Sequence, residues 1–279
     1  MARYSQISAQ CRTTSVPSRG VFQWRRASGE LVITHDLDVT AISDASMIAG
    51  LLTLIDDGVL VGQREFEAAA VAIVESIPHD DPWGCFYRNT LDELADQTSP
   101  FAPVHRRARA EIVGDSVLEV GSCFGFFALG CARDGLDVTA CDLSPGAVSM
   151  LSAASRALGI SVRARVGDAR ALPFADDAVD TITLIHLLEH LDDAGIISAL
   201  TEALRVARHR VVVAVPFEAE PSPHFGHLHS LGETDLLNWA SSVTHAGARI
   251  DVNHGGWLIL TPLSTGASFR QISPRLLAV

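Results

Sequence analysis

The chain has 279 residues, of which 48% are hydrophobic and 19% are charged, a balance typical of a compact globular protein. Its 33 acidic residues outnumber 21 basic ones, all of them Arg, so the formal charge at pH 7 is −12. An acidic chain is poorly suited to hold a polyanion over a broad surface, which disfavours nucleic acid as a substrate or partner.

Neither a disulfide framework nor a membrane span is expected. The five cysteines are odd in number and form no CxxC pair, which is typical of small buried thiols in a reducing compartment; they are Cys11, Cys85, Cys123, Cys131 and Cys141. No run of 18 apolar residues occurs, and residues 1–20 lack the apolar core of a signal peptide. We therefore expect a cytoplasmic protein.

The first third of the chain predicts a tail and a small appendage. Residues 1–20 are polar and predict a disordered tail. Residues 21–84 predict an α+β appendage, with strands at 29–34 and 59–61 and helices at 42–56 and 65–77. No residue of this segment carries recognisable chemistry.

An aromatic segment follows at residues 79–90, where Trp83, Phe86 and Tyr87 lie beside Arg88. One interpretation is an aromatic plug that joins the appendage to the main domain. The other is a lid over a ligand, with Arg88 facing a carboxylate. The sequence leaves both open.

From residue 85 to 265 the pattern predicts a larger domain. After a helical stretch at 91–113 that breaks near Pro100, strands are predicted at 117–120, 137–140, 162–166, 180–185, 210–215, 249–253 and 257–261. Helices alternate with these strands at 126–134, 145–158, 192–208 and 233–247. This alternation predicts an α/β fold with a doubly wound, mostly parallel sheet of seven strands, ending in a hairpin. Residues 266–279 would form a C-terminal tail.

Three acidic residues lie at the ends of the first three strands of this domain. Glu119 precedes a turn from Gly121 to Gly125, Asp142 follows the second strand, and Asp168 follows the third. Because the carboxyl ends of parallel strands meet at one edge, these groups should face the same ligand. Asp142 comes 21 residues after Gly121, about the offset at which a carboxylate meets ribose hydroxyls.

The glycine turn does not fit a dinucleotide. Dinucleotide sites use G-x-G-x-x-G so that a pyrophosphate can sit on the helix N-terminus. Here Cys123 and Phe126 occupy positions where that pattern needs glycine, and no Arg follows the second strand to take a 2′-phosphate. A ligand that carries adenosine without phosphate fits better, and tight binding of a nicotinamide cofactor would contradict this interpretation.

These motifs resemble those of the class I S-adenosylmethionine-dependent methyltransferases over roughly residues 85–262. Glu119-x-Gly121-x-x-x-Gly125 resembles the family's D/E-x-G-x-G-x-G motif, with Cys123 replacing the central glycine. The segment from Ile185 to Leu191 resembles the family's H-x-L-E-H-L motif. The resemblance implies that the cofactor S-adenosylmethionine contacts Glu119, Gly121, Ser122, Gly125, Asp142, Leu143, Asp168, Ala169 and His186.

Shorter motifs are similar to the mycofactocin oligosaccharide methyltransferases. They are Phe86-Tyr-Arg-Asn, Phe101-Ala-Pro-Val-His105, Gly121-Ser-Cys-Phe-Gly-Phe-Phe127 and Pro223-His-Phe-Gly-His227. This narrower resemblance implies O-methylation of a glucose hydroxyl. The alternatives are another small-metabolite or quinone-type hydroxyl, or a cofactor-binding module without catalysis.

Histidines supply candidate groups for activating the acceptor. His190 and His227 are the expected general bases, with Glu189 beside them, because an alcohol is a poor nucleophile at neutral pH. The spacing of His224, His227 and His229 also suggests a metal site, but irregularly spaced loop histidines seldom form one, so no metal is expected. The expected partner is a small molecule or oligosaccharide, and the sequence allows a homodimer.

Overall fold

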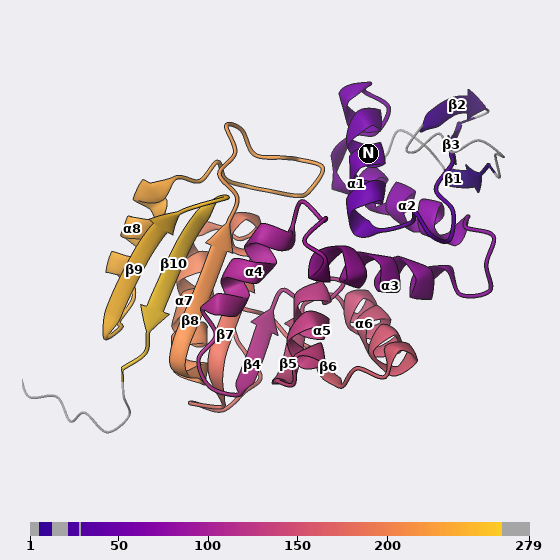
Figure 1. Ribbon diagram of the computed structural model, residues 1–279. Coiled ribbons are helices and arrows are strands. Elements are labelled where there is room, and N and C mark those ends of the chain that lie inside the picture. Colours follow the sequence, from indigo (N-terminus) through magenta and orange to yellow (C-terminus); the bar gives the residue numbers. More distant parts are fainter. Residues whose placement is uncertain (1–5, 13–21, 28, 264–279) are drawn as a thin grey trace, which may run out of the picture.

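The computed structural model describes residues 6–12, 22–27 and 29–263. Figure 1 shows a large sheet with helices on both faces and, beside it, a smaller unit that holds α1, α2 and the first three strands. The expected C-terminal tail, residues 266–279, lies outside the described residues, as do residues 1–5 and 13–20 of the expected N-terminal tail.

The large sheet has seven strands in the order β6-β5-β4-β7-β8-β10-β9. The strands are β4 (Ser116–Val120), β5 (Asp137–Asp142), β6 (Val162–Val166), β7 (Val179–Ile185), β8 (Ala207–Val215), β9 (Gly247–Val252) and β10 (Gly256–Thr261). The first five pair in parallel, whereas β10 pairs antiparallel with both β8 and β9. The predicted doubly wound, mostly parallel sheet with a terminal hairpin is confirmed.

Helices cover both faces because the central strands bury residues on both. In β8, Val212 and Ala214 pack into the core on one face, and Val211 and Val213 into the core on the other. Figure 1 shows helices in front of and behind the strands. The first face is covered by α3 (Pro82–Ala95), α4 (Ala102–Ala110), α5 (Phe126–Arg133) and α6 (Pro145–Leu158). The second is covered by α7 (Asp193–Val206) and α8 (Glu233–Ser242).

The N-terminal unit is a three-stranded sheet packed on two helices. Its strands are β1 (Gln6–Cys11), β2 (Gln23–Ala27) and β3 (Glu30–His35), and its helices are α1 (Asp44–Asp56) and α2 (Gly62–Glu75). Strand β1 corrects the expectation that residues 1–20 are disordered throughout. It pairs in parallel with β3, and Ile7 and Ala9, at alternate positions, pack against the core.

The strand expected at residues 59–61 is also absent from the structure. Asp57-Gly58 turns the chain with Gly58 at φ 66°, and the carbonyl of Leu54 accepts hydrogen bonds from the N–H groups of Val59 and Leu60. Both side chains are buried, so their apolar pattern reflects the core under a turn and not a strand. Helix α2 then begins at Gly62.

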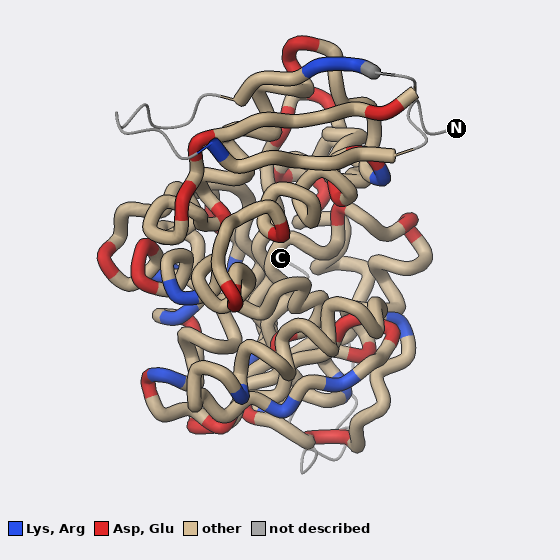
Figure 2. The backbone as a smooth tube through the Cα atoms, turned by 90° about the vertical axis from the view of Figure 1, so that its right-hand side faces the viewer, with Lys and Arg blue, Asp and Glu red and all other residues tan. Residues whose placement is uncertain are grey.

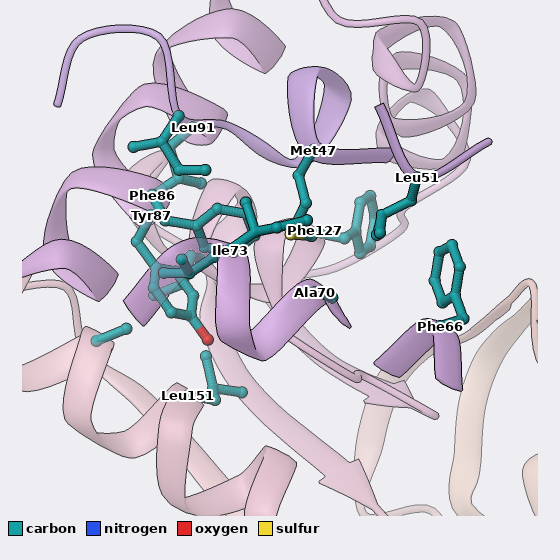
Figure 3. Packing of buried hydrophobic residues seen from close by; sticks show 14 of the residues in the cluster. Met47, Leu51, Phe66, Ala70, Ile73, Phe86, Tyr87, Leu91, Phe127 and Leu151 are labelled. Carbon is teal, nitrogen blue, oxygen red and sulfur yellow. The ribbon is translucent and has the colours of Figure 1, made fainter. Parts of the chain in front are cut away.

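Helix α3 joins the two parts. Phe86 and Tyr87 are 0% and 2% exposed, and both lie in a core that extends from Leu31 in β3 to Trp257 in β10. Figure 3 shows Phe86 and Tyr87 between residues of the N-terminal helices and those of α5 and α6. The aromatic segment is therefore the plug that was one of its two interpretations. The expected domain boundary after residue 84 falls inside this helix.

The charged residues of the described chain are spread over the molecule. Figure 2 shows Asp and Glu distributed around the whole molecule, with Arg interspersed among them. None of the helices in the described part of the chain is long and apolar enough to cross a membrane.

Candidate active site

The carboxyl ends of β4, β5 and β7 meet in the middle of the large sheet and carry the glycine loop. Gly121 and Gly125 adopt φ values of 75° and 73°, which favour glycine, and the intervening Cys123 also has a positive φ of 48°. The residue that departs from the family motif thus keeps a backbone conformation that glycine adopts more easily. A Cβ added to Gly125 would lie 2.5 Å from Leu151, so this position also lacks room for a side chain.

Two carboxyl groups fix the shape of this loop. Glu119 is 5% exposed, and its Oε2 accepts a hydrogen bond of 2.9 Å from the N–H of Ala128 in the first turn of α5. Burial raises the pKa of Glu119 to about 8. Asp142 accepts hydrogen bonds of 2.8 Å from the N–H groups of Cys123 and Ser144, and so ties the loop after β4 to the loop after β5.

The remaining residues predicted to bind the cofactor differ in exposure. Leu143 is 65% exposed, an unusual position for a large apolar side chain, whereas Ala169 and Ser122 are buried. Asp168 accepts two-pronged hydrogen bonds from Arg170, which lower the pKa of its carboxyl. An ionised carboxylate offers about four acceptor sites, so Asp142 and Asp168 retain capacity for a ligand.

His186 lies where β7 gives way to the next loop. Its φ is 50°, its N–H donates to the carbonyl of Ala214, and burial lowers the pKa of its imidazole to about 4. Its Nε2 is buried and has no hydrogen-bond partner among the described residues. A neutral imidazole with a free nitrogen at the sheet edge is available to a ligand.

Glu189, His190 and His227 form a second group at this edge of the sheet. Glu189 and His190 belong to a short 3₁₀ turn, η1 (Leu188–His190), directly after β7. His227 lies in the loop after β8, and its ring centroid is 4.9 Å from that of His190. One ligand atom from each of the three residues lies within 4.8 Å of the others. The sequence-predicted catalytic residues are thus brought together.

Burial sets the protonation of this group. Glu189 is 0% exposed, neither carboxylate oxygen has a hydrogen-bond partner in the described structure, and burial raises its pKa to about 8. Burial also lowers the pKa of His190. Nε2 of His227 lies 4.0 Å from Oε1 of Glu189.

Glu218 was not predicted as a site residue from the sequence, but it contacts His227. Its Oε2 lies 2.8 Å from Nδ1 of His227. Because an ionised carboxylate only accepts, Nδ1 of His227 donates this hydrogen bond, and Nε2 is the ring nitrogen that lies 4.0 Å from Glu189. Its position nine residues before His227 in one loop was the only available signal.

The other two histidines of this loop, His224 and His229, make different contacts. His224 packs against the rings of Phe66 and Phe225, and Nε2 of His229 hydrogen-bonds the carbonyl of Leu191 at 2.7 Å. The grouping of His224, His227 and His229 that their spacing suggested is therefore not the one that gathers in space. Arg88 pairs with Asp81 and is half exposed.

Comparison with known proteins finds similarity to methyltransferases. Residues 117–210 match a family model described as a methyltransferase domain. The chain is 36% identical to a demethylmenaquinone methyltransferase of Beutenbergia cavernae over 115 residues, which cover 38% of this chain and 45% of that protein. It is 31% identical to a ubiquinone biosynthesis O-methyltransferase of Xanthomonas euvesicatoria over 138 residues, or 43% and 58% of the two chains. The chain thus matches about half the length of these relatives.

A solved structure supports the fold. The likeness is to a protein assigned as an S-adenosyl-L-methionine-dependent methyltransferase from Methanococcus maripaludis, with a TM-score of 0.50 and 12% identity. It covers 66% of this chain and 95% of that one, and at this identity it concerns the fold alone. Residues 117–210 thus match a methyltransferase domain, within a sheet that has the fold of this solved structure.

Proposed function

We propose that the chain is an S-adenosylmethionine-dependent O-methyltransferase that acts on a polar, hydroxyl-bearing small molecule. The observation that carries the proposal is the group of Glu189, His190 and His227, which lies on the same sheet edge as the glycine loop. A methyl acceptor whose oxygen must lose a proton needs such groups close to the methyl donor.

On the donor side, the proposal assigns the glycine loop and the strand-end acids to the cofactor. Asp142 would accept hydrogen bonds from the ribose hydroxyls, and Asp168 would accept one from the adenine amino group. Leu143 would pack on the adenine ring. Glu119, Gly121, Ser122 and Gly125 would shape the glycine loop, Ala169 would contact the cofactor beside Asp168, and His186 would flank its methionine part. The exposed Leu143 and the unpartnered Nε2 of His186 support this assignment.

On the acceptor side, the cofactor supplies an activated methyl group: an O–C bond forms as the C–S bond breaks, and the hydroxyl proton departs. The chain contributes alignment and a place for the proton. Glu189, His190 and His227 would surround the acceptor oxygen, and Glu218 would hold the ring of His227 in place through Nδ1.

The acceptor we propose first is a sugar hydroxyl, specifically a glucose of a mycofactocin-type oligosaccharide. Carboxylate and imidazole groups from two loops, including Glu189, Glu218 and His227, give many hydrogen-bonding partners for a polyol. A quinone-type hydroxyl is the second candidate, because two similar proteins are named for quinone biosynthesis.

A transfer assay with labelled methyl donor tests the function. The purified chain is incubated with the donor and either glucosylated oligosaccharides or a hydroquinone carrying a free hydroxyl, and methylated product is detected by mass spectrometry. We expect methylation of the glycoside and a loss of turnover of about 10²-fold or more in His227→Gln. Methylation of the hydroquinone alone would favour the second candidate. Cofactor binding without transfer to any acceptor would favour a non-catalytic binding module.

A further inference from the structure

The group formed by Glu189, His190 and His227 has a feature that methyl transfer by itself does not require. Glu189 is completely buried, and neither of its carboxylate oxygens has a hydrogen-bond partner in the described structure. Burying a carboxyl group without partners is unfavourable, and more so when the group is charged. The residues around Glu189 should therefore allow an interaction that compensates for its burial.

The two imidazoles beside it are oriented in the manner of metal ligands. His190 Nδ1 lies 3.3 Å from the carbonyl oxygen of Gly226, and His227 Nδ1 lies 2.8 Å from Glu218. Since both partners only accept, Nδ1 of each ring is the donor, and Nε2 is the ring nitrogen left for a ligand. Metal-bound histidines commonly donate their other N–H group to a carboxylate or a backbone carbonyl, which fixes the ring.

The loops that carry these residues are held together by backbone contacts. The N–H of Leu228 donates to the carbonyl of Glu189 at 2.8 Å, and His229 Nε2 bonds the carbonyl of Leu191 at 2.7 Å. Both contacts lie directly after His227 in one loop, and they join it to the turn that carries Glu189 and His190. A site fixed in this way loses less entropy when a ligand binds than one built on free loops.

We propose that Glu189, His190 and His227 bind a divalent transition-metal cation such as Zn²⁺. Two histidines and one carboxylate, with a fourth position left open, are a donor set of catalytic zinc sites. Donor atoms around a tetrahedral cation lie about 3.4 Å apart, given ligand distances of about 2.1 Å. The present spread of up to 4.8 Å therefore needs a closure of roughly one ångström by the side chains.

The role of this cation rests on the proposed function. The open position would receive the acceptor hydroxyl, and a bound cation would lower the pKa of that hydroxyl so that its proton leaves to water. The carboxylate and imidazoles would then act as ligands and not as proton acceptors. Glu218 would be a positioning residue that acts through His227.

Metal titration tests the site without reference to activity. Protein freed of metal by chelator is titrated with Zn²⁺ by calorimetry, and Co²⁺ is used as a second probe because its visible absorption reports the coordination geometry. We expect one Zn²⁺ per chain and a tetrahedral Co²⁺ spectrum. Glu189→Gln and His227→Gln should each weaken Zn²⁺ binding at least about 10-fold, because each removes a ligand.

Two further variants keep the test decisive if a buried substitution fails to fold. Glu218→Gln, at a partly exposed position, should weaken Zn²⁺ binding about 10- to 100-fold through the orientation of His227. His224→Gln alters a histidine of the same loop that packs on Phe66, and should leave Zn²⁺ binding unchanged. Equal losses in His224→Gln and Glu218→Gln, or the absence of stoichiometric Zn²⁺ binding by folded wild type, would overturn the proposal.

The outcome is separable from the proposed function. Methyl transfer that proceeds in a chain shown to bind no divalent cation would remove the metal site and leave the methyltransferase. Stoichiometric Zn²⁺ binding without transfer to any acceptor would leave the metal site and remove the methyltransferase.

Discussion

The three carboxyl groups at the strand ends differ in burial and in hydrogen bonding, although they occupy equivalent positions in the sequence pattern. Asp142 and Asp168 keep acceptor capacity at the surface of the site, whereas Glu119 is buried and bonded to the first turn of α5. The sequence could predict all three, because each lies in or just after a predicted strand. It could not distinguish their roles, because burial is decided by what packs above the loop. The role of Glu218 was hidden for the same reason.

The buried Glu119 should make stability depend on pH. Its pKa is raised from 4.5 to about 8, so between these values the folded chain binds a proton that the unfolded chain has lost. The free energy of unfolding should therefore fall as pH rises through this window, by at most about 1.4 kcal/mol per pH unit. Denaturant unfolding at pH 5, 6, 7 and 8 measures this slope, which Glu119→Gln should reduce.

The control for the Glu119→Gln experiment is a variant of a carboxyl group that is not buried. Glu220→Gln, at an exposed loop position, should keep the wild-type slope. A Glu119→Gln variant whose slope equals that of wild type would show that Glu119 does not hold a proton in the folded chain.

Among the elements, the strands of the large sheet were predictable and several parts of the N-terminal unit were not. Apolar runs such as 211–215 bury both faces and predict their strands within one or two residues, apart from a longer start to β8. Strand β1 is polar and half exposed, so its pattern is that of a tail, and it is ordered by its pairing with β3 and by the packing of Ile7 and Ala9 against the core. Val59 and Leu60 are apolar because they lie under a turn.

Helix α3 should support the glycine loop as well as the core. The ring of Phe86 is completely buried and lies 5.4 Å from that of Phe124, which belongs to the loop. Phe86→Ala should lower the free energy of unfolding by about 3–5 kcal/mol, as for other buried phenylalanines. It should also weaken binding of S-adenosylhomocysteine, because the loop loses its packing. Denaturant titration and calorimetry measure the two effects.

A matched control lies on α8, where Leu237 is 54% exposed. Leu237→Ala should change the free energy of unfolding by no more than about 0.5 kcal/mol and should leave ligand binding unchanged. If Phe86→Ala destabilised the fold while the affinity for S-adenosylhomocysteine stayed at the wild-type value, the link from α3 to the loop would be wrong.

At the scale of the whole molecule, one sheet edge carries two sets of groups, to which we assign separate tasks. In the proposed function, the glycine loop, Asp142 and Asp168 form the donor side, and Glu189, His190 and His227 form the acceptor side. The α/β fold and the donor side were predictable because strand order brings the strand ends together. Glu189, His190 and His227 were also predicted from the sequence, whereas the contact of Glu218 with His227 was not, because it forms within a long loop after β8.

The central claim is that the donor and acceptor sides of this edge are distinct, and S-adenosylhomocysteine binding by calorimetry tests it most directly. The account predicts one binding site in wild type and a loss of affinity of about 10- to 100-fold in Asp142→Asn, which removes a charged acceptor for the ribose. Glu189→Gln should bind within about twofold of wild type, because its side chain faces the acceptor. No binding by wild type, or an equal loss in both variants, would contradict the account.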